Sequence, residues 1–560
     1  MKYKYFTFSI FFVFFSLKCI NAQDISQIKN EKPFTINGSL GASSLFYGIN
    51  GIEARSKPFS YLLSGNVNMS VYGVQIPLSF VYSEQERDFR QPFNQFGLSP
   101  KYKWATVHLG YRNIDYSSFT FSGQTILGAG VDLMPSKFRM SFMYGRFNRA
   151  VGLAQSGTAP STPAFERKGF ASRVGYGTQQ NFVDFIFVRA IDDSTSIAID
   201  STSANAPNAA ANVVLGLNSK LKFSKYLSFE SEGAISVYTA NLKTETSEEN
   251  STDIAKMSKG LMPVNASTIE KTAIKAMLQF KKRLYGVRLL YRRIDPSYKS
   301  MGTYFMNDDC QQITLEPSVN LFKQKLMLRV SSGFQNDNLQ NTKKKTTNRF
   351  INSLFASYTP FAKLTIDGNY SNYSFNQQAG TQALIDSTKT YQTNENISIS
   401  PRLIFAGEKK SHIINFSYNF TRLKDNNQFT ENLNQYSIHN VLAGYVISWN
   451  ELNMSISSGV NITSMTNNFG KTELYGVSVG FNRSFLKNKL VFTLPICLQR
   501  NDNKANKSWV FTTTSSLNYQ LHKQHSFSFN FNYIGNFSDD KLISPSFNEY
   551  KGALQYIFTF

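Results

Sequence analysis

The chain has 560 residues, a formal net charge of +22 and a mean hydropathy of −0.28. Aromatic residues make up 14% of it and charged residues only 17%. The low hydropathy excludes a bundle of membrane-spanning helices, which needs long apolar runs, and the scarcity of charge argues against an ordinary soluble protein. Aromatic residues mixed with Ser, Thr and Asn favour β-strands with one apolar and one uncharged polar face.

The N-terminal segment predicts a cleavable export signal. Two lysines precede an apolar core at 6–17, and a small-residue exit ending at Ala22 makes Gln23 the expected start of the mature chain. A core of about a dozen residues is shorter than the roughly 20 that a membrane-spanning helix needs. Cys19 raises a lipoprotein as the alternative, but Lys18 directly before it fits that signal poorly.

Apolar and polar residues alternate along most of the remaining chain. In the segment 525–533, Phe527, Phe529 and Phe531 alternate with Ser and Asn. Because successive side chains of a strand point to opposite faces, one face of this strand is aromatic and the other is small and polar. Alternating segments of about ten residues are typical of a transmembrane β-barrel, and the same pattern recurs at 74–82, 326–335, 364–371 and 490–499.

Twelve short connections alternate with longer polar segments. Outer-membrane barrels have short periplasmic turns and longer extracellular loops, so twelve turns with both chain ends at the turn end predict 26 strands, within a range of 22 to 26. The short turns are expected near 72–73, 103–104, 135–136, 178–180, 224–225, 282–284, 322–324, 360–362, 407–409, 450–451, 486–488 and 522–524, and the longer segments at 84–94, 150–163, 191–211, 241–268, 374–389 and 537–547.

The predicted fold is therefore all-β, a single transmembrane antiparallel barrel. We expect a signal peptide at 1–22, a short periplasmic tail at 23–32 and the barrel at 33–560. The tail leaves no room for an N-terminal plug domain. Segments 191–211 and 241–268 are the main places where the chain could fold back, although open polar loops are the simpler expectation for both.

The basic charge gathers at the predicted short turns. Lysine near a membrane edge can extend its ammonium group towards anionic phosphates, so these residues are expected to anchor the barrel, and nucleic acid is not needed as a partner. Removal of the three lysines of the signal leaves a net charge of +19 on the mature chain. The basic residues at or beside the short turns are Lys137, Lys225, Lys281, Lys282, Arg283, Lys323, Lys325, Lys363, Lys409, Lys410, Lys487, Lys489 and Lys523.

Alternation also places charged residues on the face that should line the lumen. Basic residues exceed acidic ones by nine to six, which is too small an excess to make a pore anion-selective, so we expect mainly paired charges that brace the barrel. An anion-favouring ring is the alternative. The candidate lumen residues are Arg112, Arg139, Arg173, Lys220, Lys275, Arg288, Arg292, Arg329 and Arg402, opposed by Asp132, Asp184, Glu230, Glu232, Glu316 and Asp367.

The chain ends in a strand pattern that finishes on phenylalanine. Gly552, Tyr556, Phe558 and Phe560 share one face and resemble the C-terminal β-signal that the barrel assembly machinery recognises in outer-membrane proteins. An edge strand can pair with that machinery before the barrel closes. In overall style the mature chain also resembles the large outer-membrane barrels of Bacteroidota. The most motif-like stretches, 99–104, 108–112 and 143–149, have no assigned chemistry, but Gly110 and Gly145 would permit close packing of neighbouring hairpins.

Three classes of function remain open. A channel or a transport- or secretion-associated conduit is favoured by the resemblance, and so wide a barrel would need inward loops or a plug or lipoprotein partner to close it. A surface scaffold for binding or adhesion is the second class. Its candidate loop aromatics are better explained as a girdle at the headgroup level: Phe46, Tyr47, Phe93, Phe96 and Tyr116.

An enzyme is the least favoured class. The five histidines, among them His108 beside Arg112, come with no nucleophile motif. Cys310 and Cys497 are expected to be free thiols, and His522 and His525 two surface histidines. We predict no catalytic residue, cofactor or metal. The expected partners are outer-membrane lipids with lipopolysaccharide and the assembly machinery, and the expected location is the outer membrane.

Overall fold

The computed structural model describes residues 32–84, 94–152, 162–198, 207–245, 252–382, 385–503 and 506–560. The predicted export signal and nearly all of the predicted tail lie outside these residues. No described helix is both long and apolar enough to cross a membrane.

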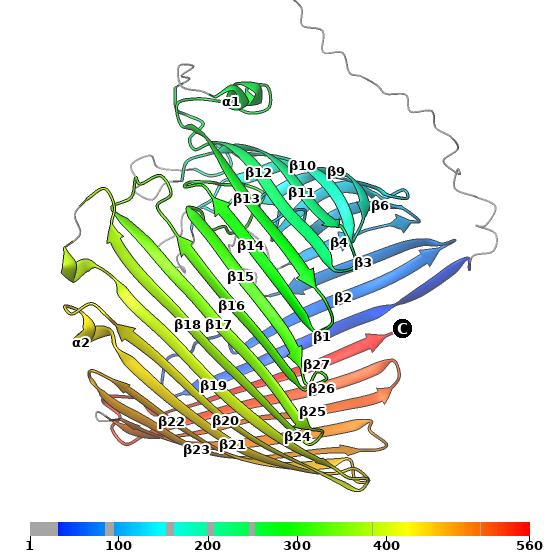
Figure 1. Cartoon of the computed structure of the whole chain (residues 1–560). Helices are drawn as coiled ribbons and strands as arrows, with labels where there is room; N and C mark the ends of the chain where they lie inside the picture. Colours follow the sequence, from blue (N-terminus) through cyan, green and yellow to red (C-terminus); the bar gives the residue numbers. More distant parts are fainter. Residues whose placement is uncertain are drawn as a thin grey trace, which may run out of the picture.

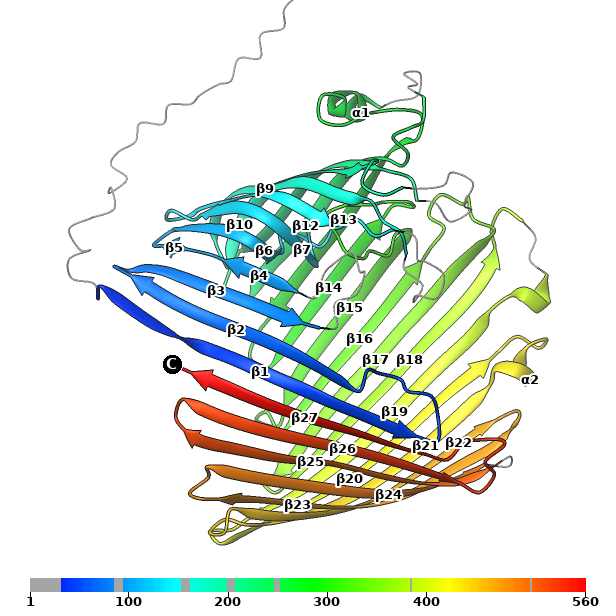
Figure 2. The same cartoon turned by 180° about the vertical axis from the view of Figure 1, so that it is seen from behind.

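The chain forms one closed antiparallel β-barrel (Figure 1). Each strand pairs with the next, and β1 pairs with β27 over Ser39–Asn50, so the sheet has no free edge (Figure 2). Segments β4 and β5 together fill one position between β3 and β6. The 27 strand segments therefore make a 26-strand barrel, which confirms the predicted fold class and strand number.

The strands are β1 (Phe34–Asn50), β2 (Phe59–Val71), β3 (Val74–Ser83), β4 (Gln95–Leu98), β5 (Lys101–Tyr102), β6 (Ala105–Ile114), β7 (Gln124–Leu133), β8 (Phe138–Asn148), β9 (Glu166–Thr178), β10 (Asn181–Asp193), β11 (Ala211–Lys222), β12 (Leu227–Thr239), β13 (Thr268–Lys281), β14 (Tyr285–Ile294), β15 (Cys310–Leu321), β16 (Leu326–Asn336), β17 (Lys345–Phe361), β18 (Leu364–Ala379), β19 (Tyr391–Ala406), β20 (Lys410–Asp425), β21 (Tyr436–Trp449), β22 (Met454–Asn467), β23 (Gly470–Phe485), β24 (Leu490–Asn503), β25 (Lys507–His522), β26 (His525–Ser538) and β27 (Phe547–Thr559). The described helices are short: α1 (Asp253–Ser258), α2 (Glu431–Asn434) and the 3-10 turn η2 (Asp386–Thr388).

The two ends of the barrel differ as predicted. All twelve predicted short turns connect strands at one end, which we call the turn end. The start of β1 lies at this end beside the C-terminus, because the backbone groups of Gly38 and Phe560 bond reciprocally. The connections at the opposite end, the loop end, are longer between β1 and β21. Two of them, 468–469 and the connection around 504–506, are as short as the turns, and only the connection at 539–546 after them is again longer. Most of the loop length therefore lies before β22.

The two faces of the wall have opposite character. On β10, Phe185 is 66% exposed on the outer face, whereas its neighbour Ile186 on the inner face is 2% exposed. The outer face carries exposed aromatic and aliphatic side chains over most strands, and a contiguous apolar surface of this extent marks contact with lipid or another apolar phase.

A row of glycines crosses five neighbouring strand positions of the inner face. Gly97, Gly110, Gly128, Gly145 and Gly169 pair in direct register from β4 to β9. A Cβ atom on Gly128 would lie 2.0 Å from the carbonyl oxygen of Tyr144, and Gly110 has a φ of +89°. Glycine permits the sharp bending that closure of a barrel requires. The close packing predicted at Gly110 and Gly145 therefore belongs to a longer row of five glycines, which we call the crease.

The wall is interrupted once, between β4 and β5. Pro100 has no N–H group and cannot donate to a neighbouring strand. The backbone N–H of Ser99 bonds to Pro77 across the break, and the N–H of Val107 bonds to the carbonyl of Pro100. Ser99 therefore lies at a fixed but irregular point of the inner wall, near the turn end.

Candidate functional site

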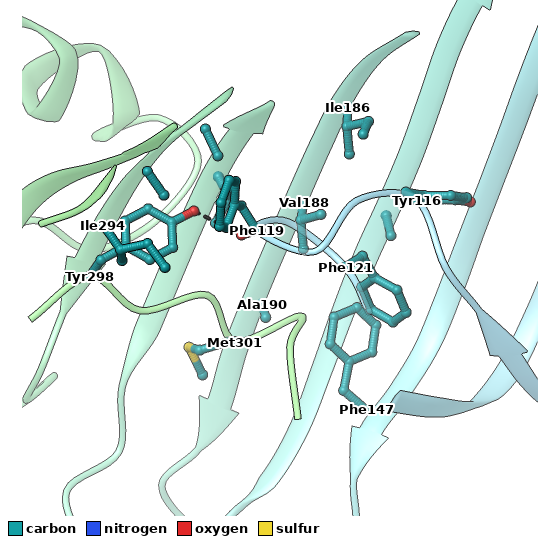
Figure 3. Packing of buried hydrophobic residues seen from close by; sticks show 14 of the residues in the cluster. Tyr116, Phe119, Phe121, Phe147, Ile186, Val188, Ala190, Ile294, Tyr298 and Met301 are labelled. Atoms are coloured by element: carbon teal, nitrogen blue, oxygen red, sulfur yellow. Dashed lines mark hydrogen bonds between the residues drawn. The ribbon is translucent and has the colours of Figure 1, made fainter. Parts of the chain in front are cut away.

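Two loops fold into the barrel from its loop end. Segment 115–123 connects β6 to β7, and segment 295–309 connects β14 to β15. They meet each other at a parallel bridge between Ser122 and Thr303. One segment enters beside β8 and the other beside β13, so the two start on opposite sides of β8–β13. Both pack on the inner face of these strands and cross the interior of the barrel (Figure 3). We call these two segments the inward pair.

The inward pair is held by a compact apolar cluster. Phe119, Phe121 and Tyr298 are almost fully buried, and the Tyr298 hydroxyl donates to the carbonyl of Phe119 at 2.8 Å. The ring of Phe121 packs against that of Phe147 on β8, with centroids 5.1 Å apart. Figure 3 shows these rings lying over the small side chains of β10. Burial of aromatic side chains on this scale stabilises each loop by several kcal/mol.

Charged and polar groups fix the same loops to the wall. The hydroxyl groups of Ser117 and Ser118 donate to Glu232 of β12 at 3.0 and 2.6 Å. Glu232 also accepts from Lys275 of β13 at 3.0 Å. The side-chain amide of Gln124 donates to two carbonyls of segment 295–309, those of Met301 and Thr303. The position of the loops is therefore set by hydrogen bonds as well as by packing.

Asp309 joins segment 295–309 to the next connection at the loop end. Its carboxylate accepts from the backbone N–H groups of Asn338 and Leu339 at 3.0 and 2.9 Å and forms an ion pair with Lys343. Burial alone would raise the pKa of Asp309, but the Lys343 ammonium and the two N–H groups outweigh it and hold the pKa below 3.8. The carboxylate therefore stays ionised, and the joint intact, throughout the neutral range.

The inward pair fills only one side of the lumen. Every buried apolar side chain among the described residues lies between Tyr47 and Cys310, and nearly all come from β6–β15 and their loops. The inner face of β18–β27 carries hydroxyl and amide groups instead, none of them covered by an apolar layer. Residues of this polar arc include Ser400, Ser417, Asn419, Asn440, Asn461, Asn482, Thr493, Ser516 and Asn530.

The charges that were assigned to the lumen divide into two groups. Four pairs brace neighbouring strands: Arg139–Asp184, Lys220–Glu230, Lys275–Glu232 and Arg288–Glu316. The remaining five basic residues form no ion pair with any described residue, whereas Asp132 contacts His108 and Asp367 accepts from Ser357. The basic excess of three residues is therefore unchanged, but it is carried by residues without an ion-pair partner. These five residues are Arg112, Arg173, Arg292, Arg329 and Arg402.

Two unpaired arginines belong to one row of the inner wall. Arg292, Gln312, Gln335 and Arg349 are direct register partners across β14–β17. The row lies near the loop end, directly below segment 295–309, because Arg292 is two residues from the end of β14. Guanidinium and amide groups are all hydrogen-bond donors. We call these four residues the basic row. Arg349 was absent from the predicted set.

A hydrogen-bonded chain lies on the inner face below segment 115–123. Ser99 Oγ is 3.0 Å from His108 Nδ1, and His108 Nε2 is 3.0 Å from Asp132 Oδ2. Asp132 also accepts from Ser141, whose Oγ is bonded to the Tyr116 hydroxyl. The motif-like stretches 99–104 and 108–112 therefore meet at this chain, and Met143–Arg149 begins two residues beyond Ser141.

The loops that fold inward are not those considered for folding back. They are 115–123 and 295–309, whereas 191–211 and 241–268 were named as the main places where the chain could do so. Segment 241–268 instead packs through Ala255 and Met262 against outward-facing residues of β11 and β12, so α1 lies outside the wall (Figure 1). Residues 199–206 and 246–251 of these two segments lie outside the described part.

The aromatic girdle accounts for only part of the loop aromatics. Phe46 and Phe96 are exposed, as a girdle at the headgroup level requires. Tyr47 and Tyr116 are buried, because both point inward and contact polar groups of the lumen. Phe93 lies outside the described residues. The two thiols, Cys310 and Cys497, are free as expected.

Known protein families do not account for the chain. No protein-family profile and no curated protein matches it. Among solved structures, it is similar to OpdK of Pseudomonas aeruginosa, crystallised with vanillate, at a TM-score of 0.31 and 10% identity over 63% of this chain and 93% of that one.

Two further structures are comparable. OccAB3 of Acinetobacter baumannii gives a TM-score of 0.31 and 12% identity over 68% of this chain and 98% of that one. The siderophore receptor PirA of Pseudomonas aeruginosa gives 0.36 and 9%, over 95% and 81%. These TM-scores assign the chain to none of these families, so its function is inferred from its own geometry.

Proposed function

We propose that the protein is an outer-membrane channel for small hydrophilic solutes, narrowed by the inward pair and biased towards anions. The observation that carries this proposal is the asymmetry of the lumen. An apolar cluster occupies one side, and a polar wall of mainly hydroxyl and amide groups lines the other. Amide and hydroxyl groups can replace the hydration of a passing solute without trapping it. The alternative, a surface scaffold without transport, has no need of an uncovered polar arc.

The basic row supports the bias towards anions. Its two guanidinium groups lie on the inner wall near the loop end of β14 and β17, close to segment 295–309, and neither forms an ion pair with a described carboxylate. Fixed cations at a constriction raise the local concentration of anions and oppose the entry of cations. The paired residues, such as Arg139 with Asp184, brace the wall and contribute little field.

Selectivity measurements test this proposal directly. In planar bilayers with a KCl gradient, we expect the purified protein to show a steady conductance and a reversal potential of the anion-selective sign. The double variant Arg292→Gln/Arg349→Gln should lower the chloride-to-potassium permeability ratio roughly fivefold at about 0.1 M salt. Each charge is worth about 0.5 kcal/mol to an ion some 8 Å away in water, and screening at that salt concentration leaves about half of it. The losses act with opposite sign on chloride and on potassium, so they add in the ratio.

The matched control removes a charge from the opposite face. Arg422 pairs with Glu395 on the outer face of β20, so Arg422→Gln should leave the permeability ratio unchanged. A silent barrel would contradict the channel and favour the scaffold. A conducting barrel whose ratio is the same in the wild type and the double variant would leave the channel but remove the role of the basic row.

We also propose the route by which the chain reaches its membrane. The export signal at 1–22 would direct secretion, and the C-terminal β-signal would present β27 to the assembly machinery, in keeping with the resemblance to Bacteroidota barrels. The outer-membrane lipids and lipopolysaccharide would then cover the exposed apolar face. A lipoprotein or plug partner would close the lumen further, beyond the part that the inward pair already fills.

Deletion of Phe560 tests the route of assembly. Phe560 forms the last backbone pair with Gly38 and its ring lies 5.4 Å from that of Phe558. We expect the deletion to reduce the folded barrel in the outer membrane at least about tenfold, because the edge strand loses its terminal anchor for templated pairing. The folded fraction is measured by its resistance to unfolding in unheated detergent gels. Deletion of the exposed Leu542, in the loop before β27, is the control, and equal losses would contradict the signal.

A further inference from the structure

The hydrogen-bonded chain at Ser99 has the connectivity of a nucleophile with its base. Ser99 and His108 are both buried, with 7% and 3% of their surface exposed, so the contact between them is shielded from competing water. The two distances of 3.0 Å, from Ser99 Oγ to the ring and from the ring to Asp132, are within normal hydrogen-bond range. A serine, an imidazole and a carboxylate in this order meet the geometric requirement for acyl transfer.

The donors and acceptors of the chain permit only one arrangement when the carboxylate is ionised and the imidazole is neutral. Asp132 can only accept, so His108 must donate through Nε2 and Ser141 through its hydroxyl. Neutral His108 then presents an unprotonated Nδ1 to Ser99, which is the form that can take a proton from the serine. Tyr116 completes the chain by donating to Ser141. Every hydroxyl group thus has one acceptor, and the base points at the serine.

Ser99 also lines a cavity that could hold a substrate. The cavity has a volume of about 830 Å³ and lies on the inner wall near the turn end. Arg112, which forms no ion pair with a described residue, lines the same cavity and places a positive charge on its wall. The other polar groups on its surface are hydroxyls and amides, including those of Ser39, Asn66 and Asn68. This lining suits a polar, uncharged substrate of modest size.

We propose that Ser99, His108 and Asp132 form an esterase site in the lumen that acts on short-chain esters of polar alcohols. Ser99 Oγ attacks the ester carbonyl as its proton moves to His108 Nδ1, and the alcohol leaves with that proton. Water then attacks the acyl-serine, gives its proton to the same nitrogen, and releases the carboxylic acid while Ser99 recovers its hydrogen. Ser99 and His108 are the catalytic residues, and Asp132 positions the imidazole. This activity is independent of the proposed channel.

The test is covalent labelling of the intact, detergent-solubilised barrel with a fluorophosphonate probe. We expect one adduct, located by peptide mapping on Ser99, together with hydrolysis of p-nitrophenyl acetate. His108→Gln should slow the labelling about 100-fold, in the range that a general base contributes, and Asp132→Asn should slow it and shift its pH profile. The control is Ser400→Ala, because Ser400 faces the lumen but bonds to Ser417 rather than to a histidine.

The outcomes are distinct even if a variant assembles poorly. The wild-type protein alone decides the main point, because absence of an adduct on Ser99 overturns the proposal. An adduct that forms equally fast in His108→Gln, with the barrel intact in unheated detergent gels, also overturns it, since the serine would then react without its base. Retained conductance with lost labelling in Ser99→Ala would show that the ester site and the channel are separate functions.

Discussion

Removal of the apolar contacts of the inward pair is expected to widen the channel. In the double variant Phe119→Ala/Tyr298→Ala, each substitution deletes an aromatic ring that is at most 2% exposed, at a cost of about 3–5 kcal/mol per ring. Segments 115–123 and 295–309 should then leave their places against β8–β13. We expect the single-channel conductance to rise at least about twofold, because a 26-strand wall encloses far more space than the polar arc alone.

The measurement needs a control that removes an aromatic ring elsewhere at the loop end. Phe469 is 77% exposed at the loop end, so Phe469→Ala should leave the conductance unchanged. An unchanged conductance in the double variant, with an intact barrel, would show that the inward pair does not limit the flow of ions.

A side chain in the glycine row is expected to prevent assembly. In Gly128→Val, the new Cβ would lie 2.0 Å from the carbonyl oxygen of Tyr144 and 2.7 Å from the Cα of Gly145. Both contacts are with backbone, so only a shift of the neighbouring strand could relieve them. The cost should exceed about 4 kcal/mol, in the range of the most damaging substitutions, and little or no folded barrel should reach the membrane.

Gly233 provides the matched comparison. It lies on β12, and a Cβ there would meet nothing within 4 Å, so Gly233→Val should assemble at nearly the wild-type level. The two variants change the same residue type to the same side chain in one wall, on the inner face of β7 at Gly128 and on the outer face of β12 at Gly233. Equal folded fractions in unheated detergent gels would show that the crease tolerates side chains after all.

The barrel itself could be predicted because its signals are local. A period of two is set by residues next to each other, and short turns such as Tyr72-Gly73 and Leu486–Asn488 depend on a few residues with positive φ. The strand number followed from counting those turns. The crease was only half predicted, because Gly110 and Gly145 stand out in the sequence but their alignment with Gly97, Gly128 and Gly169 depends on register.

The inward pair could not be predicted from local pattern. Phe119 and Tyr298 lie 179 positions apart in the sequence, and neither segment shows a strand or helix period. One signal was present: the connection at 115–123 contains a Tyr and two Phe in nine residues, which is more apolar than a loop in water should be. His108 and Asp132 were each named from the sequence, but their meeting with Ser99 was missed. The three residues lie on separate segments of the wall, and no motif joins them.

The covalent anchoring of the inward pair also limits how flow through the barrel could be controlled. Segments 115–123 and 295–309 are each tied at both ends to neighbouring strands of the wall, so neither can be withdrawn as a separate body in the way a removable domain can. The motion open to these two segments is flexing in place, and such loop motions take nanoseconds to microseconds. Solutes would then cross down their own concentration gradients, without an energised step that clears the path.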